Sequence, residues 1–145
     1  MKTGIIVLSH GKFSQELVNT AFSIVGHHDM VEEISVISEI DLNSLCERIK
    51  QKMSEMQADN IVLLTDMLGG TPCNASLMLC KNSDNIFVIS GVNLYMLITA
   101  ITARTQINDI NEYVNKIISA GKNSIINVKE RFLKNLNSTN NKTDK

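Results

Sequence analysis

The chain lacks the features that mark several specialised classes of protein. Its 145 residues include one proline and no tryptophan, and its net charge is −1. A net charge this close to zero lacks the excess of basic residues that is typical of nucleic-acid-binding proteins, so no nucleic-acid partner is expected. No apolar run approaches the roughly 20 residues that a membrane-spanning helix needs, and no signal-peptide pattern precedes the first apolar run. We therefore expect a cytoplasmic protein.

Cysteine is scarce as well. The three cysteines, Cys46, Cys73 and Cys80, are odd in number and form no Cys-x-x-Cys pair. Disulfide frameworks and zinc sites both depend on such pairs or clusters, so reduced thiols are expected. No metal and no cofactor are predicted.

What the chain does contain is an alternation of short apolar runs with helical patterns. Strands are predicted at 5–8, 31–37, 60–65 and 85–90, and helices at 13–25, 42–59, from 71 onward, 94–104 and 109–119. Asp41 is the predicted cap of the helix at 42–59. Nearly all-apolar strands that alternate with helices are typical of parallel sheets covered on both faces. The predicted fold is therefore α/β, with an open, mainly parallel sheet and helices on both faces.

The C-terminal part departs from this alternation. The β-rich stretch 124–128 follows two successive helices, with Gly121 as a hinge candidate before it. It predicts a strand at the edge of the sheet, where unpaired backbone groups can pair with another chain, so a dimer that exchanges this strand is expected. Residues 137–145 are polar and lack apolar anchors, which predicts a disordered tail.

Polar residues follow three of the predicted strands. His10 follows the first apolar run, Asp66 ends the third strand, and Ser90-Gly91 ends the fourth. Because active sites of open α/β sheets lie at the carboxyl ends of the strands, these residues are expected to meet in one crevice. Alone, each has an ordinary explanation as a polar strand end or turn former. Their coincidence at three strand ends favours a functional site.

The chemistry of these residue types suits phosphoryl transfer. A neutral imidazole can take a phosphoryl group on one ring nitrogen while its other N–H donates to a fixed acceptor, for which Asp66 is the candidate. The small residues Gly69 and Gly70, before a predicted helix, let backbone N–H groups approach an anion. Thr71 is the predicted N-cap, and its hydroxyl either contacts the anion or only caps the helix. Ser9 and Ser90-Gly91 are further candidates for the lining.

Three ordered segments resemble the IIA domain of the mannose family of the bacterial sugar phosphotransferase system (PTS). They are Gly4-Ile5-Ile6-Val7-Leu8-Ser9-His10-Gly11, Asp66-Met67-Leu68-Gly69-Gly70-Thr71-Pro72-Cys73-Asn74 and Ser90-Gly91-Val92-Asn93-Leu94-Tyr95-Met96-Leu97. The resemblance covers about residues 2–130. It implies a IIA domain over residues 1–130, followed by a helix end and a disordered polar tail over residues 131–145.

The resemblance implies a phosphotransferase that works as a phosphocarrier. The phosphorylated form of the small protein HPr would donate to His10, and His10 would pass the group to the IIB component for uptake of a mannose-family sugar through the membrane components IIC and IID. Asp66 would orient His10, and Gly69, Gly70, Thr71 and Ser9 would hold the phosphoryl group. Family members form homodimers by exchange of a C-terminal strand, in line with the stretch 124–128.

Two departures from the family pattern lie beside the expected crevice. Tyr95 replaces a usual proline, and Cys73 stands where phenylalanine is common. Neither removes a residue with a chemical role. Three alternatives remain open: a IIA-like phosphotransfer subunit of dihydroxyacetone kinase, a histidine phosphatase, and a non-catalytic protein regulated by phosphorylation. A phosphatase would need an arginine just before its histidine, and Ser9 stands there.

Overall fold

The computed structural model describes residues 1–140, with side chains through residue 134. The elements follow the order β1 (Thr3–His10), α1 (Phe13–Val25), β2 (Val31–Val36), α2 (Leu42–Met56), β3 (Asn60–Thr65), α3 (Thr71–Cys80), β4 (Ile86–Ser90), α4 (Leu94–Ala103), α5 (Ile110–Asn123) and α6 (Val128–Asn140). The strands form one sheet in the order β2-β1-β3-β4, and every neighbouring pair is parallel. The predicted open α/β sheet is confirmed.

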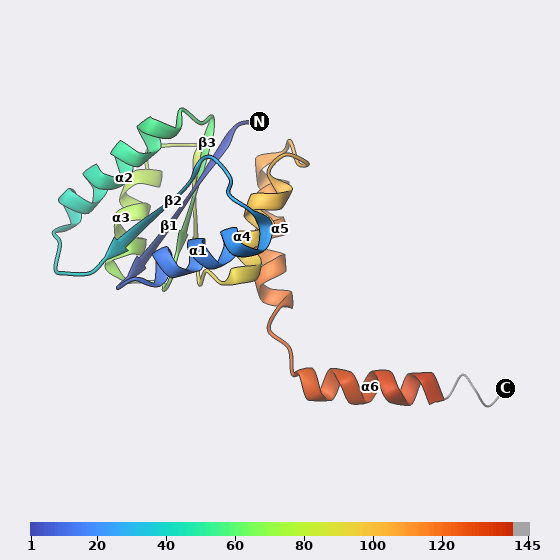
Figure 1. Cartoon of the computed structure of the whole chain (residues 1–145). Coiled ribbons are helices and arrows are strands. Elements are labelled where there is room, and N and C mark those ends of the chain that lie inside the picture. Colours follow the sequence, from blue (N-terminus) through green and yellow to red (C-terminus); the bar gives the residue numbers. More distant parts are fainter. Residues whose placement is uncertain (141–145) are drawn as a thin grey trace.

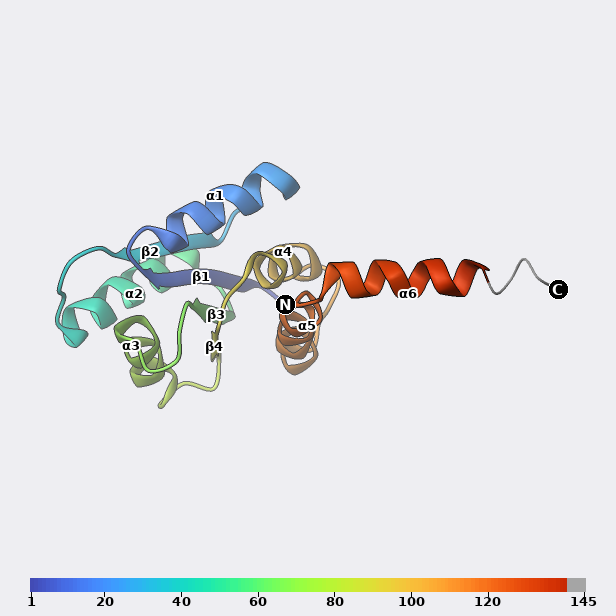
Figure 2. The same ribbon diagram turned by 90° about the horizontal axis from the view of Figure 1, so that it is seen from below.

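Helices cover both faces of this sheet (Figures 1 and 2). Successive side chains of a strand point to opposite faces, so β1 contributes to two apolar cores. Ile5 and Val7 pack in the core with residues of α1, α4 and α5, whereas Ile6 and Leu8 pack with residues of α2 and α3. This two-sided burial explains why the strand sequences are almost continuously apolar.

Polar contacts stabilise the start of α2 and connect α5 to α4. Asp41 is the N-cap of α2, as the sequence predicts, and its carboxylate accepts a hydrogen bond from the Ser44 backbone N–H at 3.0 Å. Tyr113 of α5 is fully buried, and its hydroxyl donates to the Ala100 carbonyl of α4 at 2.6 Å. The first contact stabilises the start of α2, and the second joins α5 to α4.

The parallel register aligns the carboxyl ends of the strands. Leu8 of β1 pairs with Thr65 of β3, and Thr65 pairs with Ser90 of β4. His10 and Asp66 therefore both lie just beyond this aligned row, at the same edge of the sheet. The predicted convergence of strand ends is confirmed for β1 and β3.

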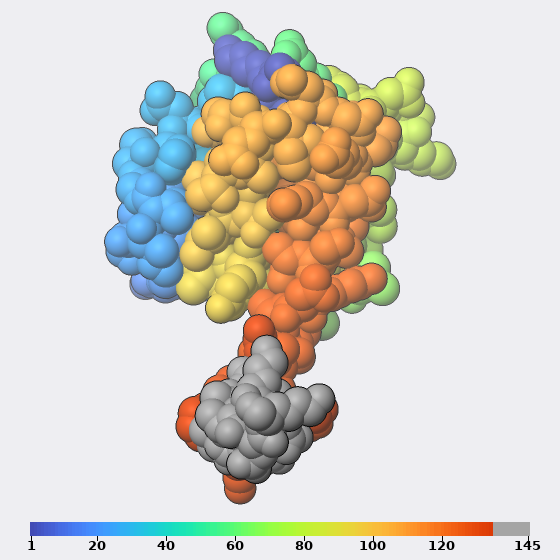
Figure 3. All heavy atoms as spheres, turned by 90° about the vertical axis from the view of Figure 1, so that its right-hand side faces the viewer, coloured from blue at the N-terminus to red at the C-terminus, as the bar shows by residue number. Residues whose placement is uncertain are grey.

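The structure corrects the prediction for the C-terminal part. The stretch 124–128 is not a strand: residues 124–127 are irregular, and Val128 begins α6, which projects away from the body (Figures 1 and 3). In the single chain this stretch pairs with no sheet edge, and Ile125 is 81% exposed. β-branched residues favour a strand only where a neighbour supplies hydrogen bonds and burial. Exchange between two chains stays a prediction.

Two smaller predictions for this part are also wrong. Gly121 is not a hinge, because α5 continues through it to Asn123, and a Cβ there would lie 2.5 Å from Cγ of Met96. The predicted disordered tail begins too early, since residues 137–140 belong to α6, and residues 141–145 lie outside the described part. Among residues 1–140, no helix has both the length and the apolar character to cross a bilayer.

Candidate functional site

The centre of the site is a pair formed by His10 and Asp66. His10 is the last residue of β1, and Asp66 directly follows β3, the strand paired with β1. Oδ2 of Asp66 accepts from the His10 backbone N–H at 2.8 Å and lies 2.8 Å from Nδ1 of the imidazole. An ionised carboxylate only accepts hydrogen bonds, so Nδ1 carries the proton and Nε2 keeps a free lone pair.

Asp66 is itself held in its ionised form. Partial burial acts to raise the pKa of this carboxyl, but hydrogen bonds from the His10 backbone, the His10 imidazole and the Met67 backbone outweigh it and lower the pKa below its usual value. The Met67 N–H donates to Oδ1 at 2.8 Å. The Asp66 side chain is 17% exposed and that of His10 is 46% exposed. Hydrogen bonds thus hold the carboxylate in place, whereas the imidazole is accessible from outside the protein.

The loop 69–70 lies against the imidazole. A Cβ built on Gly70 would lie 2.5 Å from Cε1 and 3.2 Å from Nε2 of His10, so any side chain there would displace the imidazole. Gly69 has φ +81°, a conformation that favours glycine. Asn74 holds the loop, because its side chain donates to the Gly69 carbonyl at 3.1 Å. The two glycines therefore bring backbone close to the ring.

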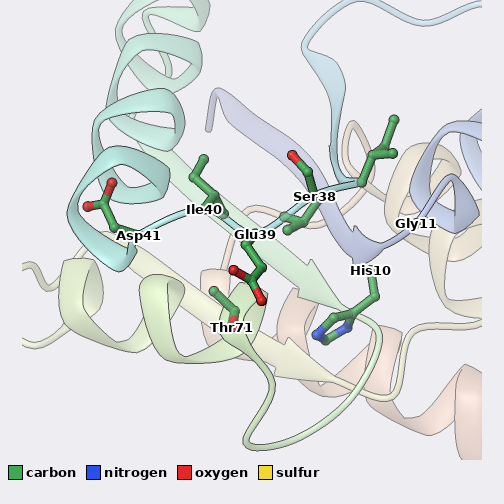
Figure 4. A pocket seen from close by; sticks show the side chains of 9 residues that line it. His10, Gly11, Ser38, Glu39, Ile40, Asp41 and Thr71 are labelled. Atoms are coloured by element: carbon green, nitrogen blue, oxygen red, sulfur yellow. The ribbon is translucent and has the colours of Figure 1, made fainter.

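The N-terminus of α3 completes this side of the site. Gly70 is the N-cap and Thr71 the first helical residue, so the prediction that Thr71 caps the helix is wrong by one position. Thr71 instead lines the same pocket as His10 (Figure 4). Backbone N–H groups in the first turn of a helix have no intrahelical acceptor and favour anions. The arrangement of Thr71 supports the anion-contact alternative.

Ser9 does not reach this pocket. Its side chain is fully buried, and its Oγ accepts a hydrogen bond from the Ser14 backbone N–H at 2.6 Å. The N-cap residue of α1, Lys12, makes no capping bond of its own. Ser9 therefore satisfies a free N–H in the first turn of α1, and the expectation that it lines the phosphoryl site is not supported. Side chains alternate along β1, so Ser9 and His10 face opposite sides of the sheet.

The end of β4 also serves a different purpose from the one expected. Ser90 and Gly91 line a separate pocket of about 140 Å³ beside α4 and α5. Asn93 caps α4 by accepting from the Met96 N–H at 3.0 Å, and its amide donates to the Gly121 carbonyl at 3.4 Å. This segment joins β4 to α4 and α5 and does not line the pocket of His10.

Sequence reasoning missed one wall of the site. The pocket of His10 measures about 750 Å³, and the segment 36–41 between β2 and α2 forms much of its lining. Figure 4 shows this segment crossing above the imidazole. The prediction of β2 as a parallel strand could have identified this wall, because its carboxyl end had to lie beside that of β1.

The comparison with protein families decides which family this chain belongs to. The family described as EIIA-man, PTS system fructose IIA component, matches residues 4–118. The chain belongs to this IIA family. The resemblance of the three sequence segments to this family is thus confirmed.

Individual relatives agree with this placement. The chain is 26% identical over 126 residues to the PTS mannose-specific EIIAB component of Escherichia coli K12; the match covers 86% of this chain and 39% of that protein. The EIIA component from Streptococcus agalactiae has 30% identity and a TM-score of 0.81, with 88% of this chain and 98% of that chain covered. The mannose/sorbose specific IIA subunit from Enterococcus faecalis has 25% identity and a TM-score of 0.79, with coverages of 88% and 96%.

The side chains of the two departures from the family pattern are not part of the pocket lining. Cys73 is buried in the first turn of α3, and Tyr95 is 63% exposed on α4. Neither lines the pocket that contains His10. The Cys73 side chain packs in the interior although its backbone lies in the turn that begins at Thr71, and the Tyr95 side chain lies on the surface.

Proposed function

We propose that this IIA protein is a cytoplasmic phosphocarrier that receives a phosphoryl group on Nε2 of His10 and passes it on. The observation that carries the proposal is the 2.8 Å contact between Asp66 Oδ2 and His10 Nδ1. It leaves Nε2 as the nucleophilic nitrogen beside Gly70 and Thr71, without the need for a separate general base. Asp66 is the residue that orients His10.

The transfer balances without any further reactant. The Nε2 lone pair of His10 forms a new P–N bond while the P–N bond of the donor phosphohistidine breaks, and that electron pair returns to the donor nitrogen. The proton on His10 Nδ1 stays where it is. Positive charge that develops on the imidazole lies against the Asp66 carboxylate, which stabilises it. The reverse order of the same events releases the group to the acceptor.

The phosphoryl oxygens would occupy the space beside the loop 69–70. Gly69 and Gly70 allow close approach of backbone, and the N–H groups of Thr71 and Cys73 belong to the first turn of α3, where Pro72 has none. The Thr71 hydroxyl supplies a further donor. Dipoles and amide groups of this kind stabilise a phosphate without a positively charged side chain.

Exposed apolar side chains around the pocket suit protein partners. Phe13, Ile37, Met67 and Leu68 are 45%, 70%, 56% and 78% exposed and lie on segments beside His10. Clustered apolar exposure of this kind marks interaction sites. We propose HPr as the donor and a IIB component as the acceptor, with a mannose-family sugar phosphorylated downstream through IIC and IID.

The test follows an acid-labile phosphoryl group by intact mass. The pure protein is incubated with phosphoenolpyruvate, enzyme I and HPr, in parallel with His10→Ala and with His27→Ala, a histidine outside the pocket. One added phosphoryl group is expected on the wild type and on His27→Ala, and none on His10→Ala. Addition of a IIB protein should then remove the label. Labelling that survives His10→Ala would refute the proposal, and retention of the label would argue for a regulatory role.

A further inference from the structure

The segment between β2 and α2 brings a carboxylate to the phosphoryl pocket. Glu39 lines the same pocket as His10 and Thr71. Figure 4 shows its side chain extending from the loop into the pocket, toward the end where Thr71 and the imidazole lie. This wall thus places a negative group in a site that must hold a phosphoryl group, which is also negative.

Glu39 is the acidic side chain of this wall that remains available. Asp41, the other carboxylate of the lining, points toward α2, where it accepts from the Ser44 backbone and hydroxyl. Within the described part of the chain, the Glu39 side chain forms no ion pair or hydrogen bond. No lysine or arginine lines the pocket. Among the side chains of residues 1–134, none pairs with the Glu39 carboxylate to neutralise its charge.

We propose that Glu39 keeps the phosphoryl group on His10 easy to transfer. A carboxylate in the same pocket repels the phosphoryl oxygens. The phosphorylated form is therefore less stable than it would be if only the backbone amide groups surrounded the phosphoryl group. A carrier that bound its phosphoryl group too tightly would not pass it on. This inference rests on the proposed function and goes beyond it, because it assigns a determinant of the transfer equilibrium to a residue outside the His10 and Asp66 pair.

The experiment is an equilibrium competition for phosphoryl groups. Tagged wild-type protein and Glu39→Gln are mixed in equal amounts with a catalytic amount of HPr, enzyme I and limiting phosphoenolpyruvate, and the two phosphorylated forms are quantified by intact mass. Both proteins exchange phosphoryl groups with the same HPr. At equilibrium the ratio of the two phosphorylated proteins therefore depends only on the relative stability of their phosphohistidines, and not on how fast either protein reacts with HPr. Glu39→Gln should hold about two- to fivefold more phosphoryl groups, as expected for one partly screened charge.

Two control variants and a change of salt concentration separate the effect of the Glu39 charge from an effect on packing. Glu39→Asp keeps the charge and should behave like the wild type, as should Asp84→Asn, in the loop before β4 and outside this pocket. The ratio of phosphorylated Glu39→Gln to phosphorylated wild type should fall toward one at about 1 M salt, where the screening length is about 3 Å. A ratio of one at low salt, an excess that salt leaves unchanged, or a Glu39→Asp that behaves like Glu39→Gln would each overturn the inference.

The proposed function has its own readout in the same mixture. If the wild type takes up no phosphoryl group through His10, the proposed function fails, and the role of Glu39 fails with it. If the wild type is labelled through His10 and the ratio stays at one, only the role of Glu39 is refuted. The two failures are thus distinguished by the total label and by its distribution.

Discussion

Asp66 holds His10 at two points, because one carboxylate oxygen lies 2.8 Å from both the backbone nitrogen and Nδ1 of the histidine. The backbone contact ties the end of β1 to the residue after β3, and the side-chain contact selects the tautomer. A single residue therefore sets both the position and the tautomer of the imidazole.

Asp66→Asn should slow phosphorylation of His10 while the protein stays folded. The amide can still accept from Nδ1, but it carries no charge to stabilise the imidazolium formed during transfer. Loss of such a supporting group usually costs about 10- to 100-fold. Rates of label uptake from phosphorylated HPr, measured by rapid quench, check this. Uptake at the wild-type rate would remove Asp66 from the mechanism.

The contribution of Asp66 to stability should disappear in acid. Its pKa is lowered in the folded protein, so the ionised carboxylate stabilises the fold fully above the unfolded value of about 4, and the contribution is lost as the pH falls through the folded pKa. The melting temperatures of the wild type and Asp66→Asn should therefore differ at pH 7 and converge as the pH falls below the unfolded pKa of about 4. A constant difference across this range would contradict the assignment.

Gly70→Ala should impair His10 more than it impairs the fold. The backbone at Gly70, with φ −73° and ψ 163°, accepts alanine, but the new methyl group would lie 2.5 Å from Cε1 of His10. The imidazole must move, and label uptake should fall by at least about tenfold, a loss typical of displaced catalytic groups.

Gly69→Ala is the matched control for this substitution. Its methyl group would meet nothing within 4 Å, but φ is +81°, so we expect a cost of about 1 kcal/mol in stability and a smaller loss of activity. Thermal melts and label uptake of both variants, measured together, make the comparison. A smaller loss of uptake in Gly70→Ala than in Gly69→Ala would show that the contact with His10 is unimportant.

Ser9→Ala tests whether this residue supports α1 or contacts the phosphoryl group. The buried Oγ accepts from the Ser14 N–H, and loss of a comparable cap costs about 1 kcal/mol, or about 3 °C in melting temperature. Phosphorylation of the folded variant should continue. Unchanged stability with lost phosphorylation would instead favour a role in the phosphoryl site.

Truncation before Ser124 should abolish dimerisation. Ile125, Val128 and Phe132 are 81%, 69% and 61% exposed in the single chain, and burial against a second copy would remove this apolar surface from water. Light scattering should give a dimer mass for the full chain and a monomer mass for the truncated one. A dimer that persists after truncation would exclude the exchange of this segment.

Local patterns were sufficient for most of the fold. The apolar runs of β1 and β3 and the cap of α2 at Asp41 depend on neighbours in the chain, and the structure confirms them. The stretch 124–128 could not be predicted in the same way, because whether β-branched residues form a strand depends on a partner edge that lies elsewhere. The strand propensity of Ile125 and Ile126 is present, but no edge pairs with them in the single chain.

The sequence by itself determined which chemical groups meet: parallel strands align their carboxyl ends, so His10 and Asp66 had to lie at one edge of the sheet. Only the tertiary structure decided which neighbours share their pocket. It joined the Ser9 hydroxyl to α1, placed Ser90 in another cavity, and brought Glu39 in from the loop after β2. The physical reason is that the alternation and register of strands are local and regular, whereas the contacts of each side chain depend on the segments that pack against it.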